Sequence, residues 1–301
     1  MPTSSSAHVV VIGSSNTDLV LSCDRLPRPG ETLLGGQFEQ HHGGKGANQA
    51  VAAARARGQV IFIGARGNDD FGQAAALALK KEKIDIRRFV VRPKISSGIA
   101  LILVGGPSRD NMIAVAKSAN DTVTARDITA ASTEIRRAGA VIAQLETPLP
   151  SVIAGAKLAK KHGIPFLLNP APARDLPAAL LKLVTILTPN ESEATLLTGE
   201  KNPERAGRAL VKKGCQNVII TLGAKGALHV TAQGAKHFPA PKVKPVDTVG
   251  AGDCFNGWLA VGVAEKLPLE RAIPRALRAA SLSVTRPGAQ SSMPHRREVS
   301  A

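Results

Sequence analysis

The chain has 301 residues, of which 44% are hydrophobic and 21% charged, so it can bury a sizeable core and is too poor in charge to be disordered. Its formal net charge of +16 suits polyanionic partners such as nucleic acid, a membrane surface or phosphorylated substrates. Lys and Arg are scattered, however, and never interleave with the few aromatic residues, which argues against nucleic-acid binding and favours electrostatic attraction of anionic substrates.

Short β-branched runs alternate with alanine-rich helical stretches for most of the length. Strands are predicted at residues 8–13 and 60–64, and helices at 46–58 and 71–82. Further apolar runs, each followed by a helical segment or a turn, lie at 140–146, 164–170, 183–189 and 217–223. Continuous apolar strands that alternate with helices indicate an α/β fold with a doubly wound, mainly parallel sheet and helices on both faces. No repeat or low-complexity linker divides the chain, so we expect a single domain over residues 1–301.

Two regions interrupt this alternation. Residues 19–41 and 95–116 have the pattern of strand pairs joined by turns that contain Pro and Gly. Such strands are predicted to form a small β-strand lid over the edge of the parallel sheet, because open α/β sheets bind ligands at the carboxyl ends of their strands. The alternative is an extra surface hairpin with no part in binding.

Cysteine usage and the amino terminus indicate the compartment. Cys23, Cys215 and Cys254 are far apart and odd in number, which argues against a disulfide framework and fits a reducing cytosol. Residues 1–13 lack the basic segment of a signal peptide, and no apolar stretch is long enough to span a bilayer. We therefore expect a cytoplasmic protein without a membrane segment.

Polar motifs follow the predicted strands. "GSSNTD" (13–18) places Asn16 and Asp18 at the carboxyl end of the first strand. The motif "VDTVGAGD" (246–253) is predicted to follow a short strand and to open a helix. Three more motifs close other strands: "LNPAP" (168–172), "TPNESE" (188–193) and "TLGAKG" (221–226). Because the carboxyl ends of parallel strands share one edge of the sheet, the pattern predicts a single cleft there.

The "GAGD" segment of this last helix start suggests a phosphate site beside a base. A turn made of Gly250, Ala251 and Gly252 offers free backbone amides and the positive end of the helix dipole to an anion. Asp253 would repel a phosphate, but it can accept a proton from a hydroxyl aimed at one. We expect the dipole to keep this Asp ionised and weakly basic, which suffices when the transition state is loose. The alternative is a helix cap with small residues for packing.

A second glycine-rich turn, "HHGGKGANQA" (41–50), also enters a helix and contains Lys45. It lacks the spacing of a Walker A loop. Its paired glycines would let the backbone approach a polyhydroxy ligand, and Asn48 can both donate and accept hydrogen bonds. The alternative is an ordinary glycine turn.

Together with "PRPGET", "QLETP", "NPAPAR" and "RPGAQSS", these motifs resemble the PfkB carbohydrate-kinase family. The matching motifs occur in the family's order from Gly13 to Ser292. The "GAGD" block is typical of the whole family, whereas "GGKGAN" with "NPAPAR" is similar to its ribokinase branch.

This resemblance implies transfer of the γ-phosphoryl group of ATP to the 5-hydroxyl of D-ribose. It implies that Asp253 is the general base and that Gly250, Ala251 and Gly252 form the anion hole. The positions that match the family's sugar site are Asn16, Asp18, Gly44, Lys45, Gly46, Ala47, Asn48, Glu146 and Asp253.

The same resemblance implies a nucleotide site and two cations. Leu277 falls at the adenine, where related chains often have a polar or imidazole side chain. Mg²⁺ would be held indirectly by Asn190 and Glu193, although "NESE" alone would indicate a helix start. The nucleotide positions are Asn190, Thr221, Leu222, Gly223, Ala224, Lys225, Gly226, Gly252, Asp253 and Leu277. The K⁺ positions, most of which would supply backbone carbonyls, are Asp247, Val249, Ser283, Arg286, Gly288 and Ser292.

The resemblance also implies a homodimer in which the lid strands of two chains clasp each other. Three other functions remain open at this point. The chain could be a kinase of the same family for deoxyribose, fructose or a nucleoside such as adenosine. It could be a sugar sensor without catalytic activity, although Asp253 and its glycine turn argue against this. The third is a basic protein that binds nucleic acid.

Overall fold

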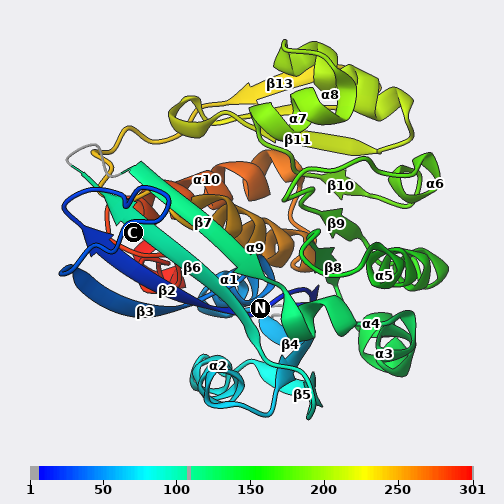
Figure 1. Cartoon of the computed structure of the whole chain (residues 1–301). Helices are drawn as coiled ribbons and strands as arrows, with labels where there is room; N and C mark the ends of the chain where they lie inside the picture. Colours follow the sequence, from blue (N-terminus) through cyan, green and yellow to red (C-terminus); the bar gives the residue numbers. More distant parts are fainter. Residues whose placement is uncertain (1–6, 107–109, 300–301) are drawn as a thin grey trace.

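Two β-sheets organise the chain in the computed structural model, which describes residues 7–106 and 110–299 (Figure 1). The larger sheet is parallel from β11 to its β5 edge, and its last two strands at the other edge are antiparallel. In spatial order its strands are β13 (Ala235–Phe238), β12 (Ala227–Val230), β11 (Asn217–Thr221), β10 (Ile186–Leu187), β9 (Phe166–Leu168), β8 (Ala140–Ala143), β1 (His8–Ile12), β4 (Gln59–Gly67) and β5 (Asp85–Arg92).

Helices cover both faces of this sheet, as the sequence predicts. Alternate side chains of β1 enter two separate hydrophobic cores, with Val9 and Val11 in one and Val10 and Ile12 in the other. The first core is closed by α1 (Lys45–Arg55), α2 (Asp70–Lys81), α9 (Ala251–Ala264), α10 (Leu269–Ser283) and α11 (Arg296–Val299). The second is closed by η1 (Ser118–Thr122), α3 (Ala125–Ala130), α4 (Ser132–Arg136), α5 (Leu149–Lys161), α6 (Ala178–Leu181), α7 (Glu191–Thr198) and α8 (Pro203–Lys212). A last short helix, η2 (Gly223–Lys225), follows β11.

Helix α9 lies in the middle of the first core and is buried along nearly its whole length. It packs between α1 and α10, and the run of alanines in α1 lets the two backbones approach. A helix that is apolar on all sides belongs in such a position. Because α1 and α9 lie against each other, polar residues in their first turns, such as Asn48 and Asp253, come into contact.

The smaller sheet has four strands in the order β3 (Gln37–Gly43), β2 (Asn16–Cys23), β6 (Gly98–Gly105) and β7 (Asp110–Ala116). Its outer pairs are antiparallel and its central pair is parallel. Strands therefore form in both regions that interrupt the α/β alternation, and they pair outside the parallel sheet. The β2 strand begins at Asn16, earlier than residue 19, so Asn16 and Asp18 belong to this small sheet.

The expectation of a strand just before "VDTVGAGD" is wrong. The preceding strand, β13, ends at Phe238, and residues 239–250 form no helix or strand. Prolines at 239, 241 and 245 explain this, since each lacks the amide that a strand ladder needs. The helix itself begins at Ala251 as predicted. None of the helices in the described ranges combines the length and apolarity that crossing a bilayer requires.

Candidate active site

Asn16 is held in a fixed orientation by a residue of η1. Its Oδ1 accepts a hydrogen bond of 2.7 Å from Nδ2 of Asn120, whose Oδ1 in turn accepts one of 2.9 Å from the Ser15 amide. Asn120 is buried, at 1% exposure, and it was missed in the sequence because nothing local marks a polar residue in η1 as buried. With its oxygen occupied, Asn16 has its amide nitrogen left to donate to a ligand.

Asp18 lies on β2 beside the glycine turn that leads into α1. A Cβ at residue 43 would lie 2.1 Å from Oδ2 of Asp18, so only glycine lets the turn pass this carboxylate. Burial, helped by the negative charge of Glu146, raises the pKa of Asp18 to about 6. This carboxylate therefore titrates close to neutral pH.

Lys45 and Glu146 occupy the space between β1 and the start of α1. Oε2 of Glu146 accepts hydrogen bonds from Oγ of Ser14 at 2.5 Å and from the Lys45 amide at 2.9 Å. Burial lowers the pKa of the Lys45 ammonium, but three neighbouring carboxylates outweigh it and raise this pKa. They belong to Asp253, Glu146 and Glu193. Lys45 is thus a firmly charged cation in an acidic pocket.

Gly46 and Ala47 are both buried beneath the loop that follows β1. The Ala47 amide donates to the carbonyl of Ser14 at 2.8 Å, and the Gly46 amide donates to its Oγ at 3.4 Å. In the structure these two residues hold the turn against the loop, and this fixes the place of Lys45 and Asn48.

Asp253 is buried, at 7% exposure, in the first turn of α9. Its Oδ2 accepts a hydrogen bond of 3.0 Å from Nδ2 of Asn48, and its Oδ1 accepts one of 2.9 Å from Nε2 of Gln49. Both donors come from the first turns of α1. The predicted base and the predicted sugar ligand Asn48 are therefore in direct contact.

The expectation that Asp253 is weakly basic is wrong. Burial raises its pKa, and the opposing effects of Lys45 and the two amide donors do not offset it. The helix dipole acts at this position, but removal from water outweighs it because the carboxylate lies below the surface. A raised pKa makes Asp253 a better proton acceptor than an exposed carboxylate.

A set of amide side chains, most of them buried, surrounds this carboxylate, and only Asn48 among them was predicted from the sequence. Gln49 also donates to Oδ1 of Asn169 at 3.1 Å and accepts a bond of 2.6 Å from Gln144. Gln290 donates to Oδ1 of Asn48 at 3.0 Å. One signal was available: Asn48 and Gln49 are polar residues followed directly by an apolar run, Ala50 to Ala54, in the same helix.

The start of α9 forms an open set of backbone amides next to Asp253. Gly250 takes a left-handed conformation with φ of 75° at the N-cap, which glycine adopts without strain. Within the described chain, the amides of Gly252 and Asp253 have no acceptor, as is usual for a first helical turn. A Cβ built on Gly252 meets no atom within 4 Å, so this side of the turn is open. Within the predicted anion site the Gly252 amide is thus free with space in front of it, whereas the Ala251 amide donates to the carbonyl of Thr248 at 3.3 Å.

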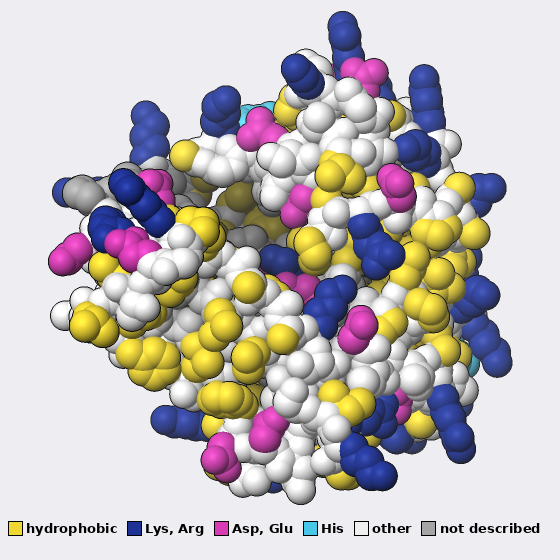
Figure 2. All heavy atoms as spheres, in the orientation of Figure 1, with side chains coloured by type: hydrophobic (Ala, Val, Ile, Leu, Met, Phe, Trp, Pro, Cys, Tyr) yellow, Lys and Arg dark blue, Asp and Glu magenta, His cyan; other side chains and the backbone are white. Residues whose placement is uncertain are grey.

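A cleft of about 630 Å³ lies in front of these amides. Figure 2 shows the face that carries the small sheet, hollowed between that sheet and α7 and α8. The predicted nucleotide residues that line the cleft are Asn190, Thr221, Gly223, Ala224, Gly226, Gly252 and Leu277. Lys242, Phe255 and Ser281 also line it and were not among the predicted residues.

Three predicted nucleotide residues do not line this cleft: the buried Asp253, and Leu222 and Lys225 in the loop after β11. The Leu222 amide donates to the carbonyl of Gly226 at 2.8 Å, which closes the turn around η2. The carbonyl of Lys225 accepts a hydrogen bond of 2.8 Å from His237. Both residues shape the loop that carries the lining glycines.

Asn190 and Glu193 form a reciprocal cap at the start of α7. Oε2 of Glu193 accepts from the Asn190 amide at 2.8 Å, and Oδ1 of Asn190 accepts from the Glu193 amide at 2.8 Å. Burial raises the pKa of Glu193, and Lys45 opposes this. Oε1 of Glu193 takes no part in the cap. Within residues 7–106 and 110–299, no three His, Cys, Asp or Glu side chains are grouped so that they could hold a metal ion.

Five of the predicted K⁺ positions lie in two loops that Asp247 joins, and the sixth, Ser283, is the last residue of α10. Oδ1 of Asp247 accepts from the Val249 amide at 3.0 Å, and Oδ2 accepts from the Gly288 amide at 2.8 Å. The Arg286 guanidinium points away to Glu298, with a hydrogen bond of 2.6 Å. The hydroxyls of Ser283 and Ser292 each donate to a carbonyl three residues earlier. Backbone carbonyls are therefore the donors that these loops can offer to a cation.

A buried carboxylate beside an open helix amino terminus, at the edge of a doubly wound sheet, defines a protein of the phosphoryl-transfer class. Residues 6–296 match the family described as pfkB family carbohydrate kinase, and the chain belongs to this family.

Individual relatives agree with the family. The chain is 39% identical over 295 residues to the ribokinase of Haemophilus influenzae, and the match covers 96% of each chain. It is 39% identical over 292 residues to the deoxyribokinase of Salmonella typhi, covering 95% of each. The solved structure of Arabidopsis thaliana ribokinase complexed with ribose and ATP is 32% identical, has a TM-score of 0.90, and is matched over 98% of this chain and 97% of that one.

Proposed function

We propose that this chain transfers the γ-phosphoryl group of ATP to the 5-hydroxyl of D-ribose and releases D-ribose 5-phosphate and ADP. One observation carries the proposal: a buried Asp253, fixed by two amides, lies beside free backbone amides that face a cleft. The carboxylate of Asp253 suits a hydroxyl nucleophile, and the free backbone amides suit a phosphate. The curated relatives named ribokinase support the sugar.

In this reaction Asp253 accepts the proton of the sugar hydroxyl as the hydroxyl oxygen attacks the γ-phosphorus. The O–P bond to the sugar forms while the bond to the ADP oxygen breaks, and the electron pair leaves with ADP. The raised pKa of Asp253 brings it closer to neutral pH, where a general base works best. Free amides of Gly252 and Asp253 stabilise negative charge on the transferred group.

Sugar recognition is assigned to the polar groups between the small sheet and α1. The free amide nitrogen of Asn16 and the carboxylate of Asp18 come from β2, and Lys45 and Asn48 come from α1. Glu146 lies behind Lys45 and fixes its backbone. A site of this kind rejects sugars that lack a hydroxyl, since its own buried groups would remain unpaired.

The cleft in front of α9 is assigned to ATP, with the adenine beside Leu277. Bound Mg²⁺ would neutralise charge on the ATP phosphates. The oxygens of Asn190 and Glu193 suit a water-mediated role, because Mg²⁺ keeps several waters and is held mainly by phosphates. Lys45, which is charged and near Glu193, orients the acidic groups around the reacting centre.

A K⁺ ion is assigned to the loops of residues 246–250 and 284–292. Asp247 bonds to amides in both loops, so it holds the carbonyls of Val249 and Gly288 in place as donors. A cation there would stiffen the turn at Gly250. This proposal rests on oxygen donors alone, which is the ligand type that such a cation prefers.

The small sheet is proposed as a lid over the sugar and as the surface of a homodimer. Every residue of β7 is exposed, so both faces of this edge strand are uncovered. Its exposed side chains include the large apolar residues Met112, at 55% exposure, and Ile113, at 58%, and the neighbouring β6 adds Leu101 at 51%. An exposed apolar sheet is a surface for another chain. We place the enzyme in the cytoplasm, in line with its three free cysteines.

The second candidate is a kinase of 2-deoxyribose. The deoxyribokinase of Salmonella typhi is as similar to this chain, at 39% identity, as the ribokinase of Haemophilus influenzae. These two sugars differ by a single hydroxyl. The reaction and the catalytic groups would be the same for both sugars.

The experiment is an ADP-release assay with MgATP and K⁺ on D-ribose, 2-deoxyribose, fructose and adenosine. Asp253→Asn is expected to reduce turnover at least 10²-fold, as loss of a general base does. Asp121→Asn, which removes an exposed carboxylate, is the matched control and is expected to keep full activity. If the enzyme prefers another of these substrates, the proposed mechanism stands and the proposed substrate is wrong. If the protein binds ribose but turns over none of these substrates, the proposed kinase activity is wrong and the chain is a sugar sensor.

A further inference from the structure

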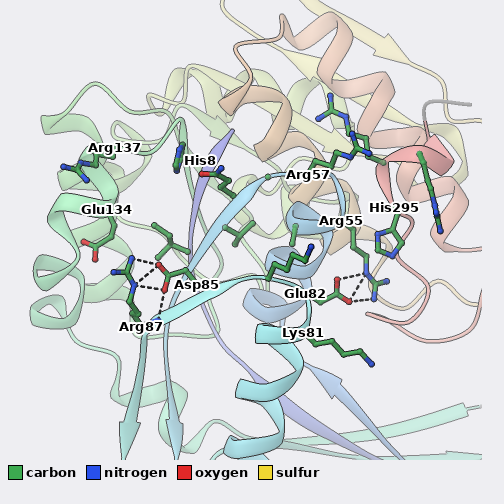
Figure 3. A pocket seen from close by; sticks show the side chains of 18 of the residues that line it. His8, Arg55, Arg57, Lys81, Glu82, Asp85, Arg87, Glu134, Arg137 and His295 are labelled. Carbon is green, nitrogen blue, oxygen red and sulfur yellow. Dashed lines mark hydrogen bonds and ion pairs between the residues drawn. The ribbon is translucent and has the colours of Figure 1, made fainter. Parts of the chain in front are cut away.

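A second hollow, of about 1070 Å³, lies at the opposite edge of the main sheet from the candidate active site. It is formed where β1, β4 and β5 begin, and Figure 3 shows it from close by. The ends of α1 and α2 and the segment around His295 form its walls, and Arg137 lies on the far side. None of the residues that line it belongs to the predicted sugar or nucleotide site.

The lining is strongly basic. It contains eight Lys or Arg residues against three Asp or Glu residues. Each of the three acids already has an arginine partner: Arg55 pairs with Glu82 at 2.6 Å and Arg87 with Asp85 at 2.6 Å, as Figure 3 shows. The third, Glu134, accepts a bond of 2.8 Å from Arg88, which is outside the lining. The acids therefore neutralise none of the remaining cations.

Five cations of the lining are left without an ion-pair partner in the described chain: Arg57, Lys81, Lys83, Arg137 and Arg297. All five are exposed and come from four separate segments. The carboxyl ends of α1 and α2 also face this hollow, and each contributes only about half a negative charge. The hollow thus keeps a large excess of positive charge.

The backbone at two of these cations is unusual. Arg57 (φ 66°) and Lys83 (φ 62°) are two of the four non-glycine residues with positive φ in the described chain. Each follows the cap of a helix, where glycine is the common residue because a side chain costs roughly 1 kcal/mol or more. Strained residues of this kind cluster at binding sites.

We propose that this hollow binds a small oligophosphate anion, one that carries two or more phosphate groups. Cations on opposite walls, such as Arg57 and Arg137 in Figure 3, suit an anion with several charged groups better than a single phosphate. The volume suits a small molecule. None of the lining residues is Phe, Trp or Tyr, so the large aromatic platforms on which single-stranded nucleic acid stacks are missing.

The test is a calorimetric titration of sodium tripolyphosphate into ADP-saturated protein at low ionic strength. Wild-type protein is expected to bind one tripolyphosphate, at least tenfold more tightly than inorganic phosphate. The double variant Arg57→Gln/Lys83→Gln is expected to bind it at least tenfold more weakly. Lys157→Gln/Lys212→Gln removes the same charge from exposed positions on α5 and α8 and is expected to change the affinity less than twofold.

Equal weakening in both double variants would mean diffuse surface charge and would overturn the site, as would the absence of binding to the ADP-saturated wild type. Tighter binding of a single-stranded oligonucleotide than of tripolyphosphate, lost in the first variant alone, would replace the ligand by nucleic acid. Thermal unfolding of each variant checks that it is folded. The readout is binding, so the result does not depend on whether the chain phosphorylates ribose.

Discussion

Nε2 of Gln290 donates a hydrogen bond of 3.0 Å to Oδ1 of Asn48. This bond decides which way the Asn48 amide faces: its oxygen is occupied, so its nitrogen is directed to Asp253, at 3.0 Å. The loop that carries Gln290 is itself held by Arg55, whose guanidinium donates to the carbonyls of Gln290 and Met293 at 2.6 and 2.8 Å. A segment near the end of the chain therefore orients the proposed base.

Gln290→Ala is expected to lower kcat for ribose three- to tenfold and to leave the KM for ATP unchanged within twofold. The loss corresponds to one hydrogen bond of about 0.5–1.5 kcal/mol, since Asn48 would no longer be held in one orientation. Gln233→Ala, at an exposed turn between β12 and β13, is the control and should behave as wild type. Steady-state kinetics with both substrates varied measures the effect. Equal kcat for the two variants would contradict the orienting role.

Gln49→Leu is expected to lower the free energy of unfolding by about 1–3 kcal/mol, because it leaves buried amide and carboxylate groups of its neighbours without a partner. It should also change the pH profile. The hydrogen bond from Gln49 lowers the pKa of Asp253, so its removal raises that pKa further and moves the acidic limb of kcat to higher pH. Urea unfolding and a pH–rate profile measure the two effects.

Gln73→Leu provides the matched control for this variant. Gln73 is exposed on α2, so the same substitution there should change neither the stability nor the pH profile appreciably. If Gln49→Leu were less stable than wild type but the acidic limb of its pH profile did not move, Gln49 would have only a structural role. That outcome would contradict its proposed effect on the pKa of Asp253.

The sequence was sufficient to predict the main sheet and the two glycine turns. Residues 9–12 are a continuous apolar run and "GAGD" opens a helix, and both patterns are local. The structure places β1 inside the sheet, between β8 and β4, and begins α9 at Ala251, as these patterns indicate. Strand ends and helix starts depend mainly on residues that are close in the sequence, so they can be predicted from one sequence.

The amides around Asp253 could not be predicted in this way. Gln290 contacts Asn48 across 242 positions of the chain, and Gln49 contacts Asp253 across 204. A glutamine with such a partner looks the same in one sequence as a glutamine on the surface. The pKa of Asp253 was misjudged for the same reason, because its burial depends on the packing of α1 against α9 and not on its own helix.

Gly250→Ala is expected to reduce kcat/KM for ATP at least tenfold. An alanine there would keep a φ of 75° only under strain, and its Cβ would lie 3.1 Å from the backbone of Ala289, so the amide turn must shift. Gly163→Ala is a control of the same type, since Gly163 has a φ of 68° and an empty space for a Cβ. Both variants should lose roughly 1 kcal/mol or more of stability through strain. If both also lost activity equally, the turn at Gly250 would have no special role.

The carboxyl of Asp18 gives the protein a pH dependence near 6. Its pKa is about 6 when folded, against an ordinary value of 3.8, so between these pH values the folded state holds a proton that the unfolded state has lost. The free energy of unfolding must then fall as the pH rises through this window. Above pH 6 the protein stays less stable by this amount, because the buried carboxylate is then ionised. We expect Asp18→Asn to be more stable than wild type at pH 7 by about 1–2 kcal/mol, after allowance for solvent screening of a partly exposed group, with the difference vanishing toward pH 4.

The same proton should govern sugar binding. The ionised carboxylate accepts hydrogen bonds from sugar hydroxyls, so the KM for ribose should rise as the pH falls below about 6, while the KM for ATP stays constant. Asp18→Asn should have a high KM for ribose at every pH and no break near 6. Asp24→Asn, at an exposed position just beyond the end of β2, should keep both the break and the wild-type stability curve. A break near pH 6 that survives in Asp18→Asn would assign the titration to another group.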